Sequence, residues 1–572
     1  MPLVFAILVS TFASGGCQNE TRGGADAAPD AELPDANESI LPPEAPRWTC
    51  PDGWQPSEEG CEPWPVGTSA CPSGEVRFPG DAACHPVGSA CPVGRWPENL
   101  PTDRPIIYVD AEAERGGSGT REDPFATLTS AIPSARAGTV VALSKGVHAE
   151  ATLWVRDNVT VRGACVAETV LEQPIRQGGV LKVMGEGVEL RDFTIRSSAA
   201  PCIVMSILTS ANLERLILEC TGVALDVRGA VELRGTDLLI QNTRIDDARN
   251  PLSDYVGIGL LIRSDSSASL ERVRFEGGHT VGILADFGAE VTLRDAAILG
   301  TQPLEGQDGV GLVAARGARL NVERSTIEEN HTAGLIAQDP WTEATLSDVV
   351  IRNSLPRALD ASFGRALVTQ LGARLSVNRV GIWRNRDIAL EVRDSETSAE
   401  LTDLTVVDTE SNAADDRFGA GVHVGDGASL AGSRIRIQSN RHWGLAVIGE
   451  AQADVSDVRI EGTAAAACVA DSCRSEVTGV GAASLFGGEL RMARFAIEDS
   501  ELAGIQLFEA AIDLSDGLVR GSPIGASISD PSIDPQRINT RVRYIDNQRN
   551  LDQMGTPPPA LPEGVEGRRA QN

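Results

Sequence analysis

The stretch GARLNVERSTIEEN, residues 317–330, returns as GARLSVNRVGIWRN at 372–385 and as GASLAGSRIRIQSN at 427–440. Each copy begins 55 residues after the previous one. The block divides again, because Ile327 to Ile351 is 24 residues, Ile351 to Ile382 is 31, and both halves read alike. A repeat of this length predicts a solenoid whose unit is one coil of about two dozen residues, with extra residues in alternate coils.

The apolar positions indicate that the coils are built of strands. Val188, Leu190, Phe193 and Ile195 alternate largely by two, and Gly, Asn and Asp interrupt such runs. One coil buries about seven inward side chains, roughly 10 to 20 kcal/mol, whereas ordering its backbone costs about 1 to 2 kcal/mol per residue. A coil therefore folds only when stacked on its neighbours. The sequence predicts an all-β protein, a right-handed parallel β-helix of about fourteen coils.

Two sets of positions recur inside the blocks. Leu375 and Ile382 have counterparts in every block and are expected in the core, whereas Arg374 is expected on the surface. Asn330, Asn385 and Asn440 share one turn of equivalent coils. Asn tolerates left-handed backbone geometry and its amide can bond to the backbone, so we expect it to shape this turn.

The chain has 572 residues, 80 acidic and 50 basic, and a net charge of −30. This charge argues against nucleic acid as a partner and against adsorption to anionic lipid. Only 4% of the residues are aromatic and 58 are Gly, which indicates a thin core.

Residues 1–17 read as an export signal. Leu3–Phe12 is apolar but too short to span a bilayer, and Ser14, Gly15 and Gly16 lead directly to Cys17. The pattern resembles a bacterial lipobox, which implies that Cys17 is lipidated and becomes the first mature residue. No Lys or Arg precedes the apolar run and Ser14 stands where Leu is usual, so ordinary secretion is the alternative. By the same resemblance, Gln18 favours the outer membrane.

The segments on either side of the solenoid have other compositions. Residues 18–46 are rich in Ala, Pro, Asp and Glu and predict a disordered tether, and 551–572 predict a disordered tail. Residues 47–104 form a Cys-rich module, and 105–550 form the β-helix.

The cysteines predict disulfides, as expected for an exported chain. Five fall close together in the module: Cys50, Cys61, Cys71, Cys84 and Cys91. A zinc site is the alternative, although no Cys-x-x-Cys pair is present. Ten cysteines remain when Cys17 is set aside, so one of the five is expected to pair with Cys165, Cys202 or Cys220. Cys468 and Cys473 are expected to bridge each other.

From Ile106 onward the chain resembles bacterial β-helix domains of the pectate-lyase-like class. The matching residues are Tyr108-Val109-Asp110, Gly116–Gly119, Asp123-Pro124-Phe125, Thr127, Ala131-Ile132, Ala137–Val141 and Lys145-Gly146-Val147. The resemblance covers about 106–550 and implies an opening strand, a capping helix and a first coil. Together with the lipobox and the Cys-rich module, it is similar to secreted β-helix lipoproteins of predatory or social soil bacteria of the myxobacterial type. This fold hosts enzymes, adhesins and scaffolds, so it does not define an activity.

No catalytic constellation stands out in the sequence. Polygalacturonases carry Gly-His-Gly, which Gly278-His279-Thr280 does not match, and His331 and His442 fall at or next to the same turn of other coils. We interpret these histidines as structural. No Ser-His-Asp arrangement, phosphate loop or dinucleotide fingerprint is present.

Insertions follow the same strand in five coils, at 242–255, 300–308, 353–363, 408–418 and 462–484. We expect them to project from one edge, stacked at two-coil spacing, where solenoids bind ligands. Asp408, Glu410, Asp415 and Asp416 place four carboxylates in nine residues, and calcium is the one cofactor they suggest. A solvated acidic edge is the alternative.

These features predict a monomeric, lipid-anchored β-helix protein at the outer membrane or outside the cell. Its role would be structural or the binding of an extracellular polysaccharide or surface protein. The alternative is a polysaccharide lyase or glycoside hydrolase acting on an acidic polysaccharide. A cleft of converging Asp and Arg on one sheet face would favour the enzyme.

Overall fold

The structure, a computed structural model, describes residues 41–65, 71–72, 74–173, 179–198, 201–243, 257–306, 308–467, 478–529 and 533–553. They belong to two compact units. The N-terminal unit contains 49–351 and 357–359, and the C-terminal unit contains 352–356, 360–553 and, from the start of the chain, 41–48. Within these described ranges, no helix is long and apolar enough to cross a membrane.

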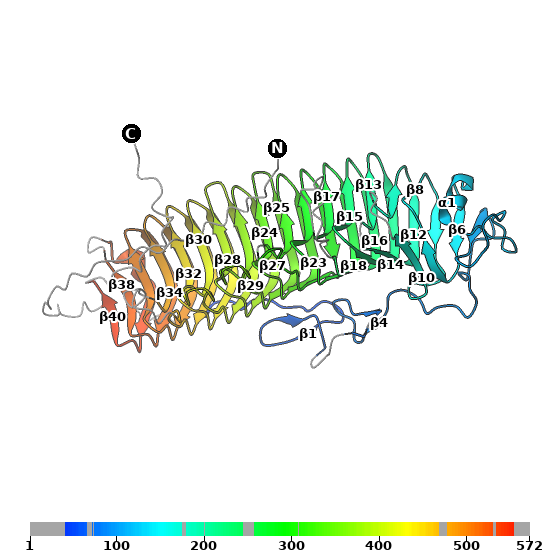
Figure 1. Cartoon of the computed structure of the whole chain (residues 1–572). Helices are drawn as coiled ribbons and strands as arrows, with labels where there is room; N and C mark the ends of the chain where they lie inside the picture. The colour runs from blue at the N-terminus through cyan, green and yellow to red at the C-terminus, as the bar shows by residue number, and fades with distance from the viewer. Residues whose placement is uncertain are drawn as a thin grey trace, which may run out of the picture. The chain divides into compact units, whose positions relative to one another are not determined.

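The N-terminal unit is a stack of parallel strands in two sheets (Figure 1). The long-strand sheet here contains β5 (Ile106–Val109), β6 (Val140–Leu143), β7 (Gly146–Ala149), β9 (Thr160–Arg162), β10 (Thr169–Gln173), β12 (Val188–Ser197), β14 (Ser210–Cys220), β16 (Glu232–Gln241), β18 (Ser267–Glu276), β20 (Glu290–Arg294), β21 (Ala297–Leu299), β23 (Arg319–Glu328) and β25 (Glu343–Arg352). The short-strand sheet contains β8 (Leu153–Val155), β11 (Leu181–Val183), β13 (Ile203–Ser206), β15 (Val223–Arg228), β17 (Ile258–Arg263), β19 (Val281–Asp286), β22 (Val310–Ala314) and β24 (Ala333–Gln338).

The C-terminal unit repeats this plan. Its long strands are β27 (Arg374–Trp383), β29 (Ser398–Val407), β31 (Ser429–Gln438), β33 (Gln452–Glu461), β35 (Glu489–Glu498), β37 (Ala511–Arg520) and β39 (Thr540–Ile545). Its short strands are β26 (Arg365–Gln370), β28 (Ile388–Arg393), β30 (Ala420–Gly425), β32 (Trp443–Ile448), β34 (Val480–Leu485), β36 (Ala503–Phe508), β38 (Ile524–Ile528) and β40 (Arg549–Asp552), and α2 (Gln536–Asn539) precedes β39. Successive coils pair in parallel, as in Leu375 with Ala399. The fold class predicted from the repeat, a right-handed parallel β-helix, is confirmed.

Side chains alternate between surface and core in the first four residues of long strands such as β23, β25 and β27, and the last four residues of these strands are all buried. Leu375 is 3% exposed and Ile382 0%, whereas Arg374 is exposed, as the repeat predicted. The short strands differ, because every residue of β22 is buried. Parallel strands buried on both faces carry unbroken apolar runs. The period-two alternation therefore describes the first part of the long strands and does not extend to the short ones.

The first coil follows the order expected from the resemblance. Strand β5 pairs in parallel with β6. Between them lie helix α1 (Leu128–Ala131) and the 3-10 turn η1 (Ile132–Ser134). The hydroxyl of Thr127 caps α1 by accepting from the backbone N–H of Ser130 at 3.2 Å.

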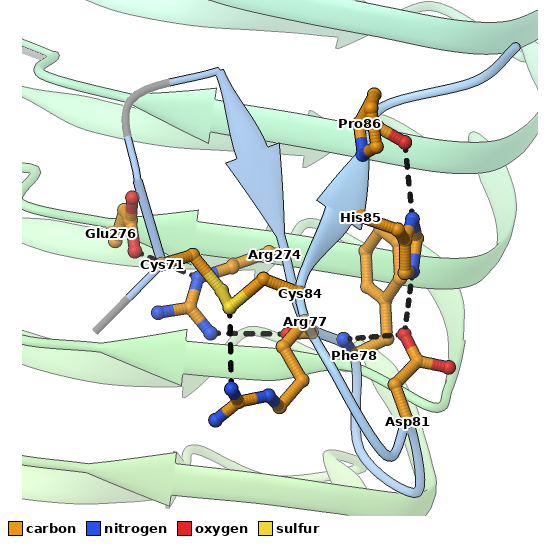
Figure 2. Close-up of a disulfide and its surroundings, with 9 residues drawn as sticks. All are labelled: Cys71, Arg77, Phe78, Asp81, Cys84, His85, Pro86, Arg274 and Glu276. Carbon is orange, nitrogen blue, oxygen red and sulfur yellow. Dashed lines mark hydrogen bonds and ion pairs between the residues drawn. A yellow bond between two sulfur atoms is a disulfide. The ribbon is translucent and has the colours of Figure 1, made fainter. Parts of the chain in front are cut away.

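The Cys-rich segment has two antiparallel ribbons, β1 (Gln55–Pro56) with β2 (Cys61–Glu62) and β3 (Glu75–Val76) with β4 (His85–Pro86). Disulfides Cys50–Cys61 and Cys71–Cys84 hold them, and Figure 2 shows the second with Arg77 beside Cys84. Its apolar residues Val76, Phe78 and Val87 share one buried cluster with Val166, Ile217 and Leu239 of the solenoid. The segment therefore completes its small core against the flank of the coils.

The remaining disulfides agree with the count made from the sequence. Cys91 pairs with Cys165, so one of the five module cysteines does bond to the solenoid. Cys202 pairs with Cys220. Cys468 and Cys473, like Cys17, lie outside the described residues.

From β12 onward, one corner residue in each coil of the long-strand sheet has a left-handed backbone, and it alternates between Asp and Arg. The N-terminal unit has Asp192, Arg215, Asp237, Arg272, Asp295, Arg324 and Asp348, and the C-terminal unit has Arg379, Asp403, Arg434, Asp457, Arg494, Asp516 and Arg541; φ lies between 47° and 65° throughout. We call each series the corner ladder of its unit. Asp adopts this conformation readily, whereas Arg does so at a cost of about 1 to 2 kcal/mol.

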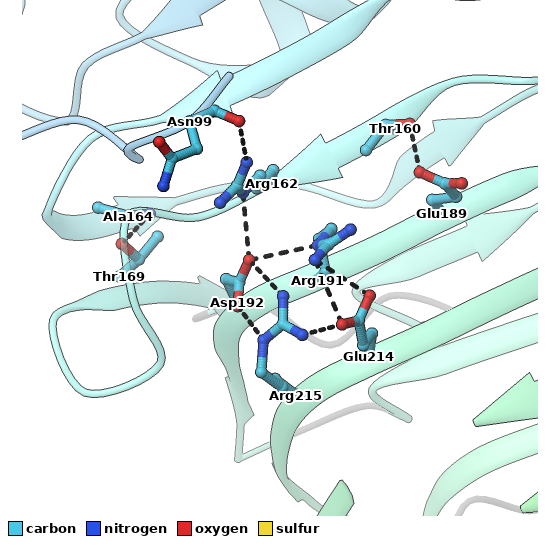
Figure 3. Close-up of polar contacts among 10 residues, drawn as sticks. All are labelled: Asn99, Thr160, Arg162, Ala164, Thr169, Glu189, Arg191, Asp192, Glu214 and Arg215. Atoms are coloured by element: carbon cyan, nitrogen blue, oxygen red, sulfur yellow. Dashed lines mark hydrogen bonds and ion pairs between the residues drawn. The ribbon is translucent and has the colours of Figure 1, made fainter. Parts of the chain in front are cut away.

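Ion pairs explain why Arg occupies such a position. Within each unit the Asp of one coil accepts from the Arg of the next, at 2.6 Å for Asp192–Arg215, 2.7 Å for Asp237–Arg272, 2.6 Å for Asp403–Arg434, 2.7 Å for Asp457–Arg494 and 2.5 Å for Asp516–Arg541. Figure 3 shows that Asp192 also holds Arg162 and Arg191. Like charges one coil apart, about 4.8 Å, would repel, so alternation lets charged side chains occupy every corner.

Candidate functional site

The insertions follow long strands, as predicted, and their neighbours touch. The backbone N–H of Leu359 donates to Gly306 O at 2.8 Å, and that of Ala467 donates to Ser411 Oγ at 3.1 Å. One boundary changes, because the last insertion ends before Val480, where β34 begins. Residues 244–255 of the first insertion lie outside the described ranges. One pair of neighbouring insertions is therefore in contact in each unit.

The recurring asparagines hold these insertions. Their amides bond to the backbone, as predicted, whereas the left-handed backbone predicted at the same positions is wrong. Asn330, Asn385 and Asn440 are each 1% exposed, and the left-handed residue is the one before each, namely Glu329, Arg384 and Ser439. Their Oδ1 atoms accept the N–H of Thr301, Ser354 and Thr409 at 3.0 Å. Each Asn thus fixes the beginning of the insertion carried by the preceding coil.

The four carboxylates predicted to bind calcium have separate surroundings. Glu410 pairs with Arg386 at 2.5 Å, and Asp415 accepts from the N–H of Arg417 at 3.1 Å. Burial raises the pKa of Asp415. In the described ranges, the one group of three metal-ligand atoms within 4.8 Å is Cys91, Cys165 and Glu168, in which the cysteines form a disulfide. Calcium binding by Asp408, Glu410, Asp415 and Asp416 stays a prediction, and this geometry adds nothing to it.

A buried network of charges lies behind the 408–418 insertion. Arg365 pairs with Asp387 at 2.5 Å and also with Glu391, and Asn412 Nδ2 donates to Asp387 at 3.1 Å. Burial would raise the pKa of Glu391, but the charge of Arg365 lowers it overall. These groups satisfy one another, so we assign the network to the attachment of the insertion.

The turn histidines described by the structure pack against their neighbours. His442 is 3% exposed and stacks on Trp443 with ring centroids 3.6 Å apart. Burial lowers the pKa of His442 to about 3, so the ring is neutral near pH 7. His279 Nδ1 lies 3.0 Å from Thr243 O. Both contacts agree with the structural interpretation.

An open cleft of about 460 Å³ lies on the long-strand sheet of the C-terminal unit beside α2. Asp454, Arg491 and Asp513 occupy the same register in three successive coils and line it together with Arg537. The guanidiniums are already paired, Arg491 with Glu489 and Arg537 with Asp513 at 2.7 Å. The hydrogen bond from Arg537 lowers the pKa of Asp513, which therefore stays ionised.

The turn that follows the short strands carries large exposed apolar side chains in the N-terminal unit. Ile207 and Leu208 follow β13 and are 70% and 71% exposed, Phe287 follows β19 and is 45% exposed, and Trp341 follows β24 and is 82% exposed. All four have positive φ. This conformation is strained for apolar residues, and for the branched Ile207 above all.

Phe287, Arg316 and Trp341, which we call the aromatic edge, come from three successive coils. Arg316 lies over the Phe287 ring, its guanidinium carbon 4.0 Å from the ring centroid. Buried Asp286 accepts from Arg316 Nε at 2.6 Å, and the Arg316 N–H donates to Asp339 Oδ2 at 3.2 Å. The Arg316 guanidinium is therefore held over the Phe287 ring of the preceding coil, and exposed Trp341 follows in the next coil.

The aromatic edge was not found from the sequence. Phe287 and Trp341 do not share a recurring position in the 55-residue block, and exposure depends on how the turns stack. The corner ladder did have a sequence signal, since Arg324, Arg379 and Arg434 keep the 55-residue step, as do Asp348 and Asp403.

No family model matches the chain, and no curated protein matches it. Solved structures that are similar include pectate lyase Pel9A, at 12% identity over 49% of this chain and 78% of that one, with a TM-score of 0.35. The catalytic unit of an α-1,3-glucanase from Streptomyces thermodiastaticus is 13% identical over 75% and 70%, at 0.33. The Dettilon tailspike protein is 9% identical over 77% and 68%, at 0.32. The fold defines the class of parallel β-helix proteins, and similarity this low carries no argument on activity.

Proposed function

We propose that this protein is an exported β-helix, anchored through Cys17 at the outer membrane, that binds a neutral polysaccharide along its aromatic edge. The observation that carries the proposal is the exposure of Phe287 and Trp341 at one edge of the unit, with Arg316 held over the Phe287 ring. A sugar ring presents C–H bonds on one face, which pack on an aromatic ring, and hydroxyl groups at its rim, which bond to charged groups. Exposed apolar groups gathered in one place mark binding sites on soluble proteins.

The geometry suits an extended chain of sugars. Phe287 and Trp341 are two coils apart, about 10 Å, so successive rings of one polymer can rest on both. The net charge of −30 repels polyanions at long range, and Arg316 is already neutralised by Asp286. We therefore favour a neutral polysaccharide over the acidic one that the enzyme alternative would need.

The cleft with Asp454 and Asp513 keeps a glycoside hydrolase or lyase as the second candidate, because it gathers Asp and Arg on one sheet face. Glycoside hydrolysis requires a carboxylic acid whose pKa is raised. Of the carboxyl groups that line the cleft, Asp513 is paired with Arg537 and has a lowered pKa, the opposite of what this acid requires. The binding role is therefore better supported.

Affinity electrophoresis in gels containing neutral or acidic polysaccharides tests the binding site. Trp341→Ala and Phe287→Ala should each weaken retardation at least tenfold, about 1.4 kcal/mol. Trp154→Ala is the matched control, because Trp154 is 43% exposed on another strand of the same unit. Equal retardation of Trp341→Ala and Trp154→Ala would contradict the proposal, and product release abolished in Asp454→Asn would establish the enzyme instead.

The anchor has a separate test. Cys17→Ser should move the protein from the detergent-extracted membrane fraction to the soluble fraction. Unchanged membrane association would exclude lipidation of Cys17 and leave the binding site untouched.

A further inference from the structure

The proline-rich stretch Pro42-Pro43-Glu44-Ala45-Pro46-Arg47 lies on the corner ladder of the C-terminal unit. The backbone N–H of Arg47 donates to Asp403 Oδ1 at 2.8 Å. The backbone N–H of Glu44 donates to Asp457 Oδ1 at 3.2 Å. Backbone groups therefore make both contacts, and both acceptors are the acidic members of the ladder.

The spacing of the two N–H donors along the segment matches the spacing of the two Asp acceptors along the ladder. The two donors are three residues apart, and the two acceptors are two coils apart, about 9.6 Å. A polyproline II chain has three residues per turn and advances about 9.3 Å in that turn. Such a chain presents one N–H to the ladder every three residues, at the distance that separates Asp403 from Asp457.

The sequence of the segment favours this conformation. Proline fixes φ near the polyproline II value, and it restricts the residue before it to extended geometry. Pro43 and Pro46 precede the two donors and supply no N–H of their own. Three residues per turn also put Glu44 and Arg47 on one face, where their side chains pair at 2.8 Å.

The ladder carboxylates can accept these extra bonds while they hold their arginines. Arg434 donates to both oxygens of Asp403 at 2.6 and 2.9 Å, and Arg494 donates to both oxygens of Asp457 at 2.8 and 2.7 Å. Each carboxylate oxygen has two acceptor positions, so one stays open for a backbone N–H. The hydrogen bond from Arg494 lowers the pKa of Asp457, to which the Glu44 N–H contributes, so the acceptor is charged near pH 7.

We infer that the alternate Asp residues of the corner ladder form a recognition surface for a polyproline II chain, and that residues 42–47 are its resident ligand. The surface reads the three-residue period of the backbone, because backbone N–H groups make the hydrogen bonds to Asp403 and Asp457. Asp516, two coils beyond Asp457, holds Arg541 in the same way, and the backbone N–H groups of Glu44 and Arg47 donate to Asp457 and Asp403 instead. It is therefore an unused position of the same surface and a matched control.

Amide hydrogen exchange on the full chain tests the contacts one at a time. In the unmutated protein the amides of Glu44 and Arg47 should be protected, and that of Ala45 should exchange freely. Asp403→Asn should speed exchange at Arg47 at least tenfold, and Asp457→Asn should do so at Glu44. Asp516→Asn removes a ladder charge without a segment contact and should leave both amides protected. The inference is overturned if all three variants behave alike.

A change of register tests the period itself. One Ala inserted between Ala45 and Pro46 places the donors four residues apart, so protection at Glu44 or at Arg47 should be lost. Ala45→Ser keeps the spacing and should retain both. Retention of both in the insertion variant, with an unchanged melting temperature, would show that the carboxylates do not recognise the three-residue period.

Discussion

The corner ladder and the aromatic edge of the N-terminal unit both use residues other than glycine in left-handed turns, with opposite results. At the ladder, the Arg272 side chain forms ion pairs with Asp237 and Asp81, at 2.7 and 3.0 Å. At the edge, Trp341 is 82% exposed. Backbone strain alone therefore does not mark a binding site in this fold. At the ladder, ion pairs offset the backbone strain and hold the coils together. At the aromatic edge, a bound ligand would explain why an exposed apolar side chain keeps a strained backbone.

The largest expected effect is at the ladder. Asp192→Ala leaves Arg162, Arg191 and Arg215 without their shared acceptor and puts Ala at a φ of 65°. We expect a loss of about 3 to 5 kcal/mol in the free energy of unfolding, measured with denaturant. Asp192→Asn, which tolerates the backbone, should lose less. A loss below that of Trp341→Ala would reverse the comparison.

The core should follow closely. Leu375→Ala and Ile382→Ala should each cost about 2 to 5 kcal/mol, because both side chains are buried in β27. Exposed Arg374→Ala should cost less than about 0.5 kcal/mol. Equal costs at Leu375 and Arg374 would show that the register of the long strands is wrong.

Acid should weaken the ladder of the C-terminal unit. Arg494 lowers the pKa of Asp457 through a hydrogen bond, and Arg541 does the same for Asp516. A carboxyl group whose folded pKa is lowered stabilises fully above its unfolded value, about 3.9, and loses that contribution as the pH falls through the folded pKa. Melting temperatures recorded from pH 6 to 2.5 should fall below about pH 4, and Asp457→Asn should flatten that fall.

Asp295→Asn is the control for this titration, because burial raises the pKa of Asp295 instead. Its ionised form is disfavoured in the fold, so removing its charge should not flatten the acid limb. If Asp295→Asn and Asp457→Asn flatten it equally, the lowered pKa of Asp457 is not the source of the acid limb.

The smallest effect on stability should come from the edge. Trp341→Ala removes an exposed side chain and should change the free energy of unfolding by less than about 0.5 kcal/mol, while glycan retardation falls at least tenfold. Chemical denaturation and affinity electrophoresis on the same preparation separate the two quantities. A variant that loses stability and binding together would place Trp341 in the architecture.

The sequence predicted the fold because a solenoid repeats its core positions, and Leu375 and Ile382 recur with the block. It also predicted one module cysteine bound to the solenoid, since the cysteine count required it, and the Cys91–Cys165 bond confirms this. The recurrence of Asn440 predicted a bond between its amide and the backbone. It did not predict the partner, because Thr409, whose N–H donates to Asn440 Oδ1, lies in another coil.

The candidate site depended on information that no repeat contains. The exposure of Phe287 and Trp341 arises from how unequal turns stack, which periodicity does not encode. The corner ladder could have been predicted, since Arg324 and Arg379 keep the 55-residue step. The fold prediction used the apolar positions, and the recurring charged positions were not considered. The four carboxylates of the 408–418 loop suggested a calcium site, but composition does not show that Glu410 is paired with Arg386.

Because Asp and Arg alternate at the corner, the coils of the solenoid are of two kinds that must follow each other in turn. Deleting one coil would set Asp beside Asp or Arg beside Arg at about 4.8 Å, whereas deleting two coils restores the order. The asparagine that holds each insertion also recurs only in every second coil. Length can therefore change without penalty only by whole pairs of coils, and a gene for this protein could grow by duplicating pairs of coils and not single ones.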